Sequence, residues 1–219
     1  MGNSEKFRLI VPQPEHEQAV KNYIAEYYRS REVTDRAVFL SKDAFKLYGS
    51  GGLFCYAKDY TSWLEKLTTD RNRATDAENV PTETYFLVRE TIARHGAKNV
   101  LPKEDFVGMV NIRLSMNDAY WGHDGSIGYN IRPDMRGNGY SKINLFLALC
   151  ICQKHGFESV LLTCNKTNFA SAATIRALGG RLVREKHFSE RQYILQYYMI
   201  DVDRAIAEHE TEYVKYVVR

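Results

Sequence analysis

Apolar residues follow a helical spacing near the start of the chain. Pro14, Glu15 and Glu17 suit the first turn of a helix, where the backbone dipole favours acids. Five apolar residues then share one face of this helix, at positions i, i+3, i+4, i+7 and i+8: Val20, Tyr23, Ile24, Tyr27 and Tyr28. Before it, residues 6–12 form a predicted strand that Pro12 ends. The chain is therefore predicted to open with a strand and an amphipathic helix, whose tyrosines pack in the core or line a substrate site.

Strands and helices alternate from residue 82 onward. Eight elements are predicted: strands at 85–88, 106–114 and 126–131, a helix at 139–155, a strand at 160–164, a helix from Asn168 to Leu178, and two strands at 181–187 and 191–200. The helix at 139–155 is apolar on nearly every side, which predicts burial against a sheet. The β-rich run at 160–164 suits a central strand with parallel pairing. Gly179 and Gly180 provide the stop of the second helix.

The remaining segments are less regular. Residues 30–80 are predicted to be an insertion that holds a short helix from Trp63 to about residue 70 and a glycine-rich loop at 48–52, which we interpret as flexible. A long loop is expected at 90–105, and a charged helical tail at 202–219. We find no internal repeat, so residues 1–219 are predicted to form a single mixed α/β domain.

Composition and charge narrow the class of protein. The chain has 219 residues, of which 44% are hydrophobic and 26% charged, as in ordinary globular proteins. Its formal net charge of +3, without a run of like charges, predicts no nucleic-acid partner. There is no 18-residue apolar run and no apolar N-terminal signal region, so we expect no membrane insertion and a cytoplasmic location. The four cysteines lack zinc-ligand spacing, so no metal is expected.

The segment between the strand at 126–131 and the helix at 139–155 carries the chemical signal. Arg136, Gly137 and Gly139 form a turn that opens a helix, where the first backbone N–H groups have no partner within the helix. These groups and the helix dipole make an anion site, and glycine lets the backbone approach a phosphate closely. Neither of the established glycine-rich phosphate motifs fits. The turn alone therefore predicts an anion site without specifying the phosphate ligand.

Two motifs in order resemble a known family. The segment Ile127–Ser141 is similar to the cofactor motif of the GNAT superfamily of N-acetyltransferases, Gln/Arg-x-x-Gly-x-Gly/Ala. Arg136 and Gly139 occupy its first two positions, whereas Ser141 replaces the usual Gly or Ala. Residues 161–171, followed by Leu178-Gly179-Gly180, resemble the family's strand, Asn-x-x-Ala/Ser helix and closing glycine. The resemblance implies a mixed, mostly antiparallel sheet with a central, splayed parallel strand pair, flanked by helices.

The resemblance also implies acetyl-CoA as cosubstrate. The pantetheine arm would lie in the split, near the backbone of Tyr129 and Ile131. The pyrophosphate would bind the N–H groups of five consecutive residues: Gly137, Asn138, Gly139, Tyr140 and Ser141. Asn165 and Asn168 would contact the arm or the nucleotide end. An amine would then attack the thioester directly, without a covalent enzyme intermediate.

The catalytic residues depart from the family's pattern at the usual acid and base positions. Ser126 occupies the position of the usual Glu, and Ile175 that of the usual Tyr. The remaining candidates are Ser171 as a donor to the leaving thiolate, Tyr129 on the cofactor strand, Ser126 as a relay, and the polar turn His123-Asp124. A nucleophilic Cys164 would permit a ping-pong route, but its place inside a strand favours burial.

The sequence therefore predicts an N-acetyltransferase that acts on a primary amine. The alternative is an acyl-CoA-binding sensor without transferase activity, because the usual Glu and Tyr are missing. Several acids could receive a cationic acceptor: Glu32, Asp35, Asp43 and Asp59. A homodimer is predicted through the C-terminal strands, with apolar Tyr193, Ile194, Leu195 and Tyr197, or through the tail.

Overall fold

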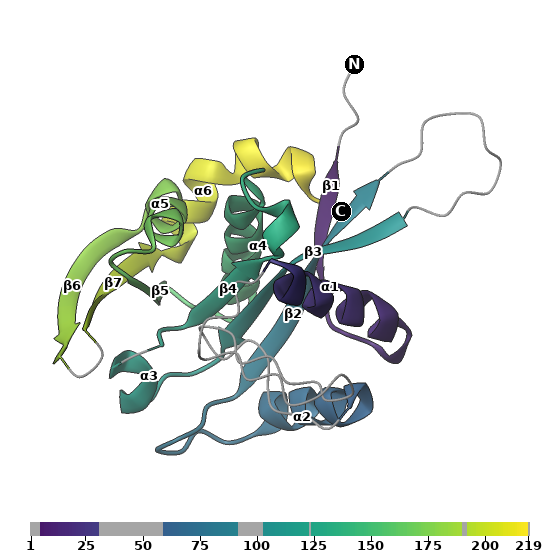
Figure 1. The fold of residues 1–219 in the computed structure, drawn as a ribbon. Helices are drawn as coiled ribbons and strands as arrows, with labels where there is room; N and C mark the ends of the chain where they lie inside the picture. Colours follow the sequence, from purple (N-terminus) through teal and green to yellow (C-terminus); the bar gives the residue numbers. More distant parts are fainter. Residues whose placement is uncertain (1–4, 31–58, 92–102, 123, 190–191, 219) are drawn as a thin grey trace.

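The computed structural model describes residues 5–30, 59–91, 103–122, 124–189 and 192–218. Its regular elements are, in chain order, β1 (Lys6–Ile10), η1 (Pro14–His16), α1 (Glu17–Arg29), α2 (Tyr60–Asn72), β2 (Thr82–Thr91), β3 (Lys103–Arg113), α3 (Asp118–Gly122), β4 (Ile127–Ile131), η2 (Pro133–Met135), α4 (Tyr140–Lys154), β5 (Ser159–Asn165), α5 (Phe169–Ala177), β6 (Arg181–Phe188), β7 (Tyr193–Asp201), α6 (Val202–Tyr213) and η4 (Val214–Tyr216). Figure 1 shows their arrangement. The predicted acids Glu32, Asp35 and Asp43, the loop at 48–52 and His123 lie outside the described residues.

The strands form two antiparallel sheets, ordered β1-β2-β3-β4 and β5-β7-β6. The sheets meet where β4 begins: the Ser126 N–H donates to the Leu161 carbonyl at 2.6 Å, and Gly125 bridges Leu162. The expected parallel pairing of β4 with β5 is not seen among the described residues, and the Gly125–Leu162 bridge is antiparallel. The prediction of a mostly antiparallel α/β fold with a split between two central strands, flanked by helices, is confirmed.

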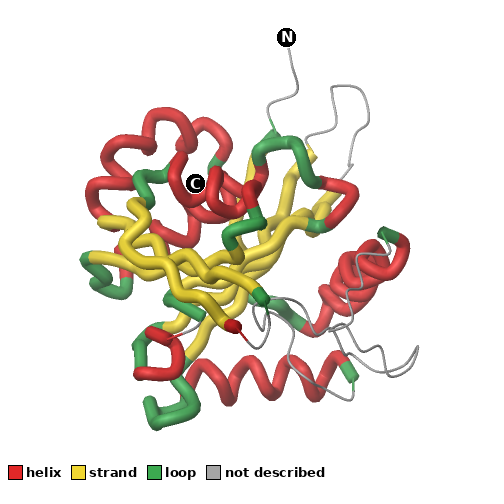
Figure 2. The backbone as a smooth tube through the Cα atoms, turned by 60° about the vertical axis from the view of Figure 1, so that its left-hand side comes forward, coloured by secondary structure: helices red, strands yellow, loops and turns green. Residues whose placement is uncertain are grey.

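Helices cover both faces of the first sheet, because its strands carry apolar side chains on both sides. Phe86 and Val88 face α1 and α2, where they pack in one cluster with the buried Tyr23 of α1 and Trp63 of α2. Leu87 points to the other side, into the larger core around α4. Figure 2 shows the helices on either side of the strands. The predicted burial of the apolar helix at 139–155 is confirmed, since most of the residues of α4 are inaccessible to solvent.

The C-terminal tail differs from its prediction as one helix over 202–219. The helix α6 ends at Tyr213, and the chain continues through η4 to the edge of β1. There the Val218 N–H donates to the Phe7 carbonyl at 3.0 Å, and Phe7 forms a parallel bridge with Val217. The tail therefore covers an edge of the first sheet with backbone hydrogen bonds that a continued helix could not provide.

Candidate functional site

The turn between β4 and α4 needs two glycines for its backbone conformation. After Ile131, the short helix η2 leads to Gly137 and Gly139, which have φ angles of 81° and 80°. This left-handed region is unfavourable for most side chains. A Cβ added at either glycine would have no atom within 4 Å, so the glycines are not required by packing against the protein itself. The space before this turn is open and can admit a ligand.

The start of α4 supplies hydrogen-bond donors to that space. Gly139 is the N-cap residue and has no side chain with which to cap the helix, which then runs for 15 residues from Tyr140. The first N–H groups of a helix have no partner within it, and the helix dipole adds positive potential there. This arrangement fits an anionic group such as a pyrophosphate.

A cleft of about 390 Å³ extends from this turn between β4 and α5. Nine of the residues predicted from the sequence line it: Tyr129, Ile131, Arg136, Gly137, Gly139, Tyr140, Ser141, Asn168 and Ser171. Four further lining residues were not predicted: Asn130, Met135, Ala170 and Thr174. The sequence held a weak signal for them, because each neighbours a predicted residue on its strand, turn or helix.

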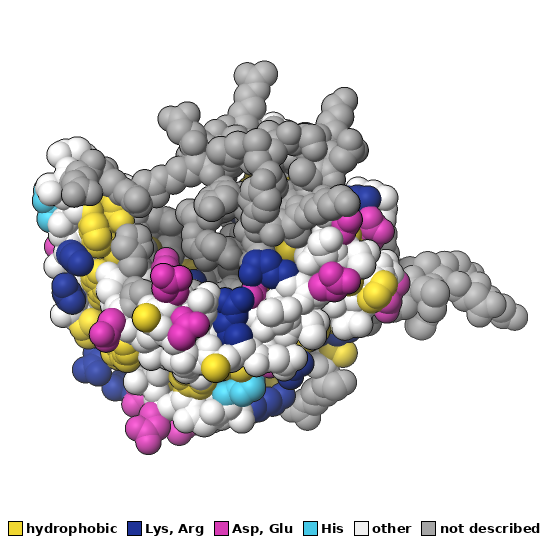
Figure 3. Space-filling model, turned by 90° about the horizontal axis from the view of Figure 1, so that it is seen from below, with side chains coloured by type: hydrophobic (Ala, Val, Ile, Leu, Met, Phe, Trp, Pro, Cys, Tyr) yellow, Lys and Arg dark blue, Asp and Glu magenta, His cyan; other side chains and the backbone are white. Residues whose placement is uncertain are grey.

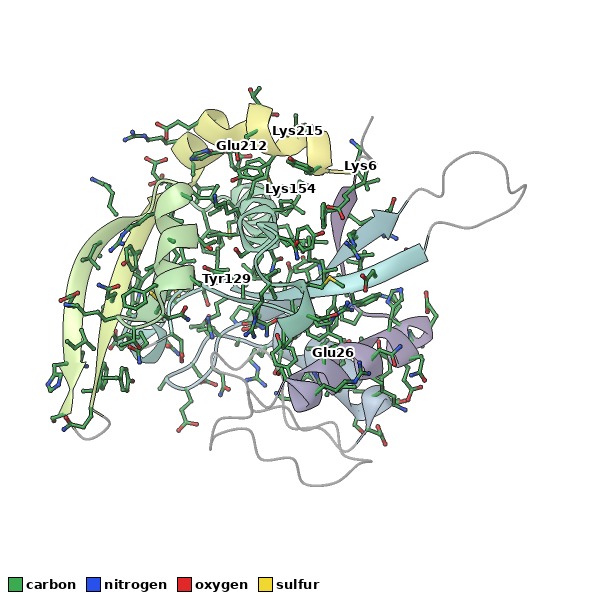
Figure 4. All side chains as sticks on the ribbon, turned by 45° about the horizontal axis from the view of Figure 1, so that its top comes forward. Lys6, Glu26, Tyr129, Lys154, Glu212 and Lys215 are labelled. Atoms are coloured by element: carbon green, nitrogen blue, oxygen red, sulfur yellow. The ribbon has the colours of Figure 1, made fainter. Side chains whose placement is uncertain are left out.

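Tyr129 and Ser171 meet at the α5 side of the cleft. Their hydroxyl oxygens are 3.1 Å apart, so one can donate to the other. Figure 4 labels Tyr129 in its position near α5. Burial raises the pKa of Tyr129 to about 12, and the hydrogen bond with Ser171 offsets this in part. Tyr129 is therefore a protonated phenol at neutral pH, able to donate a hydrogen bond.

Ser171 is positioned by the cap of its own helix. The Asn168 side chain accepts a hydrogen bond from the Ser171 N–H at 3.1 Å, as an N-cap residue does with the third residue of a helix. One turn further on, the Thr174 hydroxyl lies 3.0 Å from the hydroxyl of Ser141 on α4. The α5 wall is thus joined to the first turn of α4 by a side-chain hydrogen bond.

Two tyrosines of α1 donate hydrogen bonds to residues of β4. The Tyr23 hydroxyl donates to the Asn130 side chain, and the Tyr27 hydroxyl donates to the Ile131 carbonyl at 3.3 Å. The Arg136 Nε donates to the same carbonyl at 3.1 Å, and its guanidinium lies 5.9 Å from the centre of the Tyr27 ring. The sequence placed these tyrosines on one helical face but could not show which strand they contact.

Three predicted site residues do not line the cleft. Ser126 is 3% exposed, and its hydroxyl accepts from the Leu161 N–H at 3.1 Å, which ties the start of β4 to β5. The Asn138 side chain donates to the Met135 carbonyl at 3.0 Å and closes the glycine turn. The Asn165 side chain accepts from the Thr167 N–H at 3.0 Å in the turn before α5. In this structure all three side chains form hydrogen bonds with backbone groups near the cleft.

Cys164 is buried beside the Tyr129–Ser171 pair. Burial raises the pKa of its thiol, while a hydrogen bond with Ser171 and the charge of Arg176 act in the opposite direction. A thiol with a raised pKa has little thiolate and is a weak nucleophile at neutral pH. The arrangement therefore favours direct attack on a thioester over a covalent intermediate at Cys164.

One face of the molecule carries charges of both signs. In Figure 3, Lys and Arg side chains are interspersed with Asp and Glu over the described part of the face. Among the described residues, no three His, Cys, Asp or Glu side chains group in a way that could hold a metal ion. No helix in the described ranges is both long and apolar enough to cross a membrane.

Comparisons with known proteins identify the family. The model of the acetyltransferase (GNAT) family matches residues 57–179, which is more than half of the chain. A search of curated proteins finds no match. Among solved structures, a mutant form of the spermidine/spermine N-acetyltransferase SpeG from Vibrio cholerae superimposes with a TM-score of 0.56 at 10% identity, covering 93% of this chain and 98% of that one.

Two further solved structures show the same fold. RimL, a ribosomal α-N-protein acetyltransferase in complex with coenzyme A, has a TM-score of 0.56 at 11% identity and covers 90% of this chain and 96% of its own. MccE, a microcin self-immunity acetyltransferase in complex with acetyl-CoA and AMP, has a TM-score of 0.55 at 13% identity, with coverages of 89% and 91%. With a family match over residues that include the glycine turn and the cleft, the chain belongs to the acetyltransferase (GNAT) family and is an acetyl-CoA-dependent N-acetyltransferase.

Proposed function

We propose that the chain transfers the acetyl group of acetyl-CoA directly to a primary amine. The observation that carries the proposal is the cleft itself, which joins an anion site at the start of α4 to the Tyr129–Ser171 pair. SpeG is a spermidine/spermine N-acetyltransferase and RimL is a ribosomal α-N-protein acetyltransferase, and these two structures support an amine acceptor here by analogy of fold.

The glycine turn is the part of the cleft that would hold the donor. The N–H groups of Gly137 through Ser141 would bind the pyrophosphate, with the charge of Arg136 close by. The backbone of Tyr129 and Ile131 would hold the pantetheine arm. Asn165 and Asn168 are proposed contacts of the arm or the nucleotide end, and Asn138 is a proposed contact of the pyrophosphate. When bound, acetyl-CoA supplies the thioester that the amine attacks.

Side chains of the protein would then transfer protons during the reaction. A C–N bond forms as the C–S bond breaks, the attacking nitrogen loses a proton to solvent, and the leaving thiolate gains a proton. Ser171 can donate to that sulfur and recover a proton from Tyr129, whose hydroxyl is 3.1 Å away, and solvent then returns a proton to Tyr129. Ser126 is buried against β5, and Ile175 is fully buried, so neither is a side-chain base facing the cleft. The acceptor would therefore react as the fraction that is already a neutral amine.

A thiol-release assay tests this function. Acetyl-CoA is incubated with the chain and spermidine, a peptide with a free α-amine, or a lysine-containing peptide with a blocked N-terminus. We expect release of free thiol that depends on one of these amines, with the acetylated amine found by mass spectrometry. Tight CoA binding without amine-dependent release across a broad panel would contradict transfer and favour an acyl-CoA sensor.

A further inference from the structure

A network of partly buried charges lies beside the glycine turn and reaches the cleft-lining residue Tyr140. It begins at Arg132, the residue that directly follows β4. The Arg132 guanidinium donates two hydrogen bonds to Asp134, at 2.7 and 3.0 Å. It also donates to Asp105 at 2.8 Å and to the Phe106 carbonyl at 2.9 Å. Its side chain is only 11% exposed, so water screens these interactions weakly. The chain entering the turn is thereby fixed to β3.

The same carboxylate reaches the other end of the turn through a second arginine. Arg89 on β2 donates to Asp105 at 2.8 Å and, through another nitrogen, to the Tyr140 hydroxyl at 3.1 Å. Tyr140 is the first residue of α4, its ring packs on Phe7, and its hydroxyl donates to Glu5 at 2.9 Å. The chain leaving the turn is therefore fixed to the same point on β3.

We infer that Asp105 is a positioning residue that sets the distance between the two ends of the cofactor turn and so determines the affinity for the pyrophosphate of the donor. Asp105 is the carboxylate to which both arginines bind, one from each end. The anion site needs several backbone N–H groups to converge on one ligand, and their convergence depends on how residues 132 and 140 are held. The inference rests on the proposed function, because it assigns the anion site to the pyrophosphate of acetyl-CoA.

Removing the charge of Asp105 should loosen both ends at once. In Asp105→Asn, two partly buried guanidinium groups face each other across a neutral amide, and one of them loses its charge-assisted hydrogen bond. The donors of the turn then have to be ordered by the ligand, which weakens binding. Ser171 and Tyr129 lie on the other side of the cleft and stay in place, so the chemical step at saturating donor should change little.

A truncated donor separates positioning from general damage. CoA binding is measured by calorimetry, and turnover is measured with acetyl-CoA and with acetyl-pantetheine, which has no pyrophosphate. For Asp105→Asn we expect roughly tenfold weaker CoA binding and a similarly raised KM for acetyl-CoA, with kcat within about twofold of the wild-type value. The kcat/KM for acetyl-pantetheine should match that of the wild-type chain. Tyr140→Phe, which keeps the ring and removes only the hydroxyl, should weaken CoA binding in the same sense by a smaller factor.

The matched control is Glu104→Gln, one residue away on β3. Its carboxylate binds Arg8 and belongs to the opposite face of the strand from Asp105. We expect wild-type CoA affinity for this variant. If the wild-type chain binds CoA normally and the affinity is unchanged in Asp105→Asn and in Tyr140→Phe, this inference is overturned and the proposed function is not. Equal losses with CoA and acetyl-pantetheine would overturn it too, and a wild-type chain that binds no CoA would overturn the proposed function with it. If Asp105→Asn does not fold, Tyr140→Phe decides.

Discussion

For Ser171, the sequence predicted the position in the helix but not the partner of the hydroxyl group. Its place at the third position of α5 follows from Asn168, and the hydrogen bond from the Ser171 N–H to that side chain confirms it. The partner of its hydroxyl could not be predicted, because strand alternation left Tyr129 facing either the core or the split. Only the fold brings together two hydroxyls that are 42 residues apart. The proton-donor role remains a prediction that depends on this pair.

The first prediction removes that hydroxyl. Ser171→Ala should lower kcat roughly tenfold, less than the 10²–10⁴-fold of strong general acids because water can replace the hydroxyl. The KM for acetyl-CoA should change little, since a donor to the leaving thiolate acts mainly in the transition state. Steady-state kinetics on Ser171→Ala and Tyr129→Phe would check this. An unaltered kcat in both variants would transfer the acid role to solvent, whereas a loss confined to Tyr129→Phe would assign it to the phenol.

The second prediction concerns pH. Burial raises the pKa of Tyr129 to about 12, so its phenol keeps its proton well above the usual pKa of a tyrosine. If it supplies the proton, kcat should not fall as the pH rises through 10. Activity should instead increase with pH until the acceptor amine is neutral, because no side-chain base is assigned. A pH profile of kcat from 6 to 10.5, recorded with an acceptor of known pKa, tests this. A descending limb below pH 10 that disappears in Tyr129→Phe would contradict it.

At the scale of elements, the turn between β4 and α4 was the most predictable part of the site. Its glycines need a left-handed backbone, and the apolar helix behind them must be buried, so both sequence signals have direct physical causes. Asn138 and Asn165 were less predictable, because an Asn in a turn can bind a ligand or the turn's own backbone. In the structure their side chains bond the backbone, and contacts with the donor remain proposals.

The third prediction tests the turn. Gly139→Asp places a negative charge at the anion site and should lower the affinity for CoA at least tenfold, about 1.4 kcal/mol. Asp and Asn tolerate the left-handed region better than most residues, and a Cβ here meets nothing within 4 Å, so the fold should persist. Gly139→Asn is the matched control for strain, because it has a similar shape without the charge. Equal CoA affinity of Gly139→Asp and wild type in a titration would show that the anion site lies elsewhere.

For the whole molecule, sequence patterns predicted the order of elements better than their pairing. The strand at 85–88 is longer than predicted, extending over Thr82–Thr91, because polar residues at its ends still join the ladder with β3. The strand at 6–12 is shorter, ending at Ile10. The family resemblance implied a split between β4 and β5, but it did not show that the split divides the strands into two separate sheets. Apolar residues that were assigned to an interface, such as Leu195 and Tyr197, are buried within the second sheet instead.

That burial changes the argument for a homodimer. β7 lies between β5 and β6, so it offers no free edge, and the tail covers the edge of β1. Among the described strands, β6 is the outer edge of the second sheet, with Leu182 and Val183 44% and 55% exposed. Its arginines and the irregularity between Leu182 and Arg184 are features that limit pairing between edges. The other edges, β4 and β5, border the split between the sheets, so we expect a dimer that forms through the strands to use β6.

The last prediction follows from this choice of edge. The wild-type chain should have a mass of twice 25.3 kDa by light scattering at micromolar concentration. Val183→Pro removes a backbone donor from the edge of β6 and should reduce the mass to that of one chain, since a proline interrupts strand pairing. Val11→Pro, at an exposed position beyond β1, is the control and should leave the dimer intact. CoA binding should persist in both variants, because neither residue lines the cleft. A wild-type mass of 25.3 kDa would refute the dimer, and a dimer that survives Val183→Pro would move its interface away from β6.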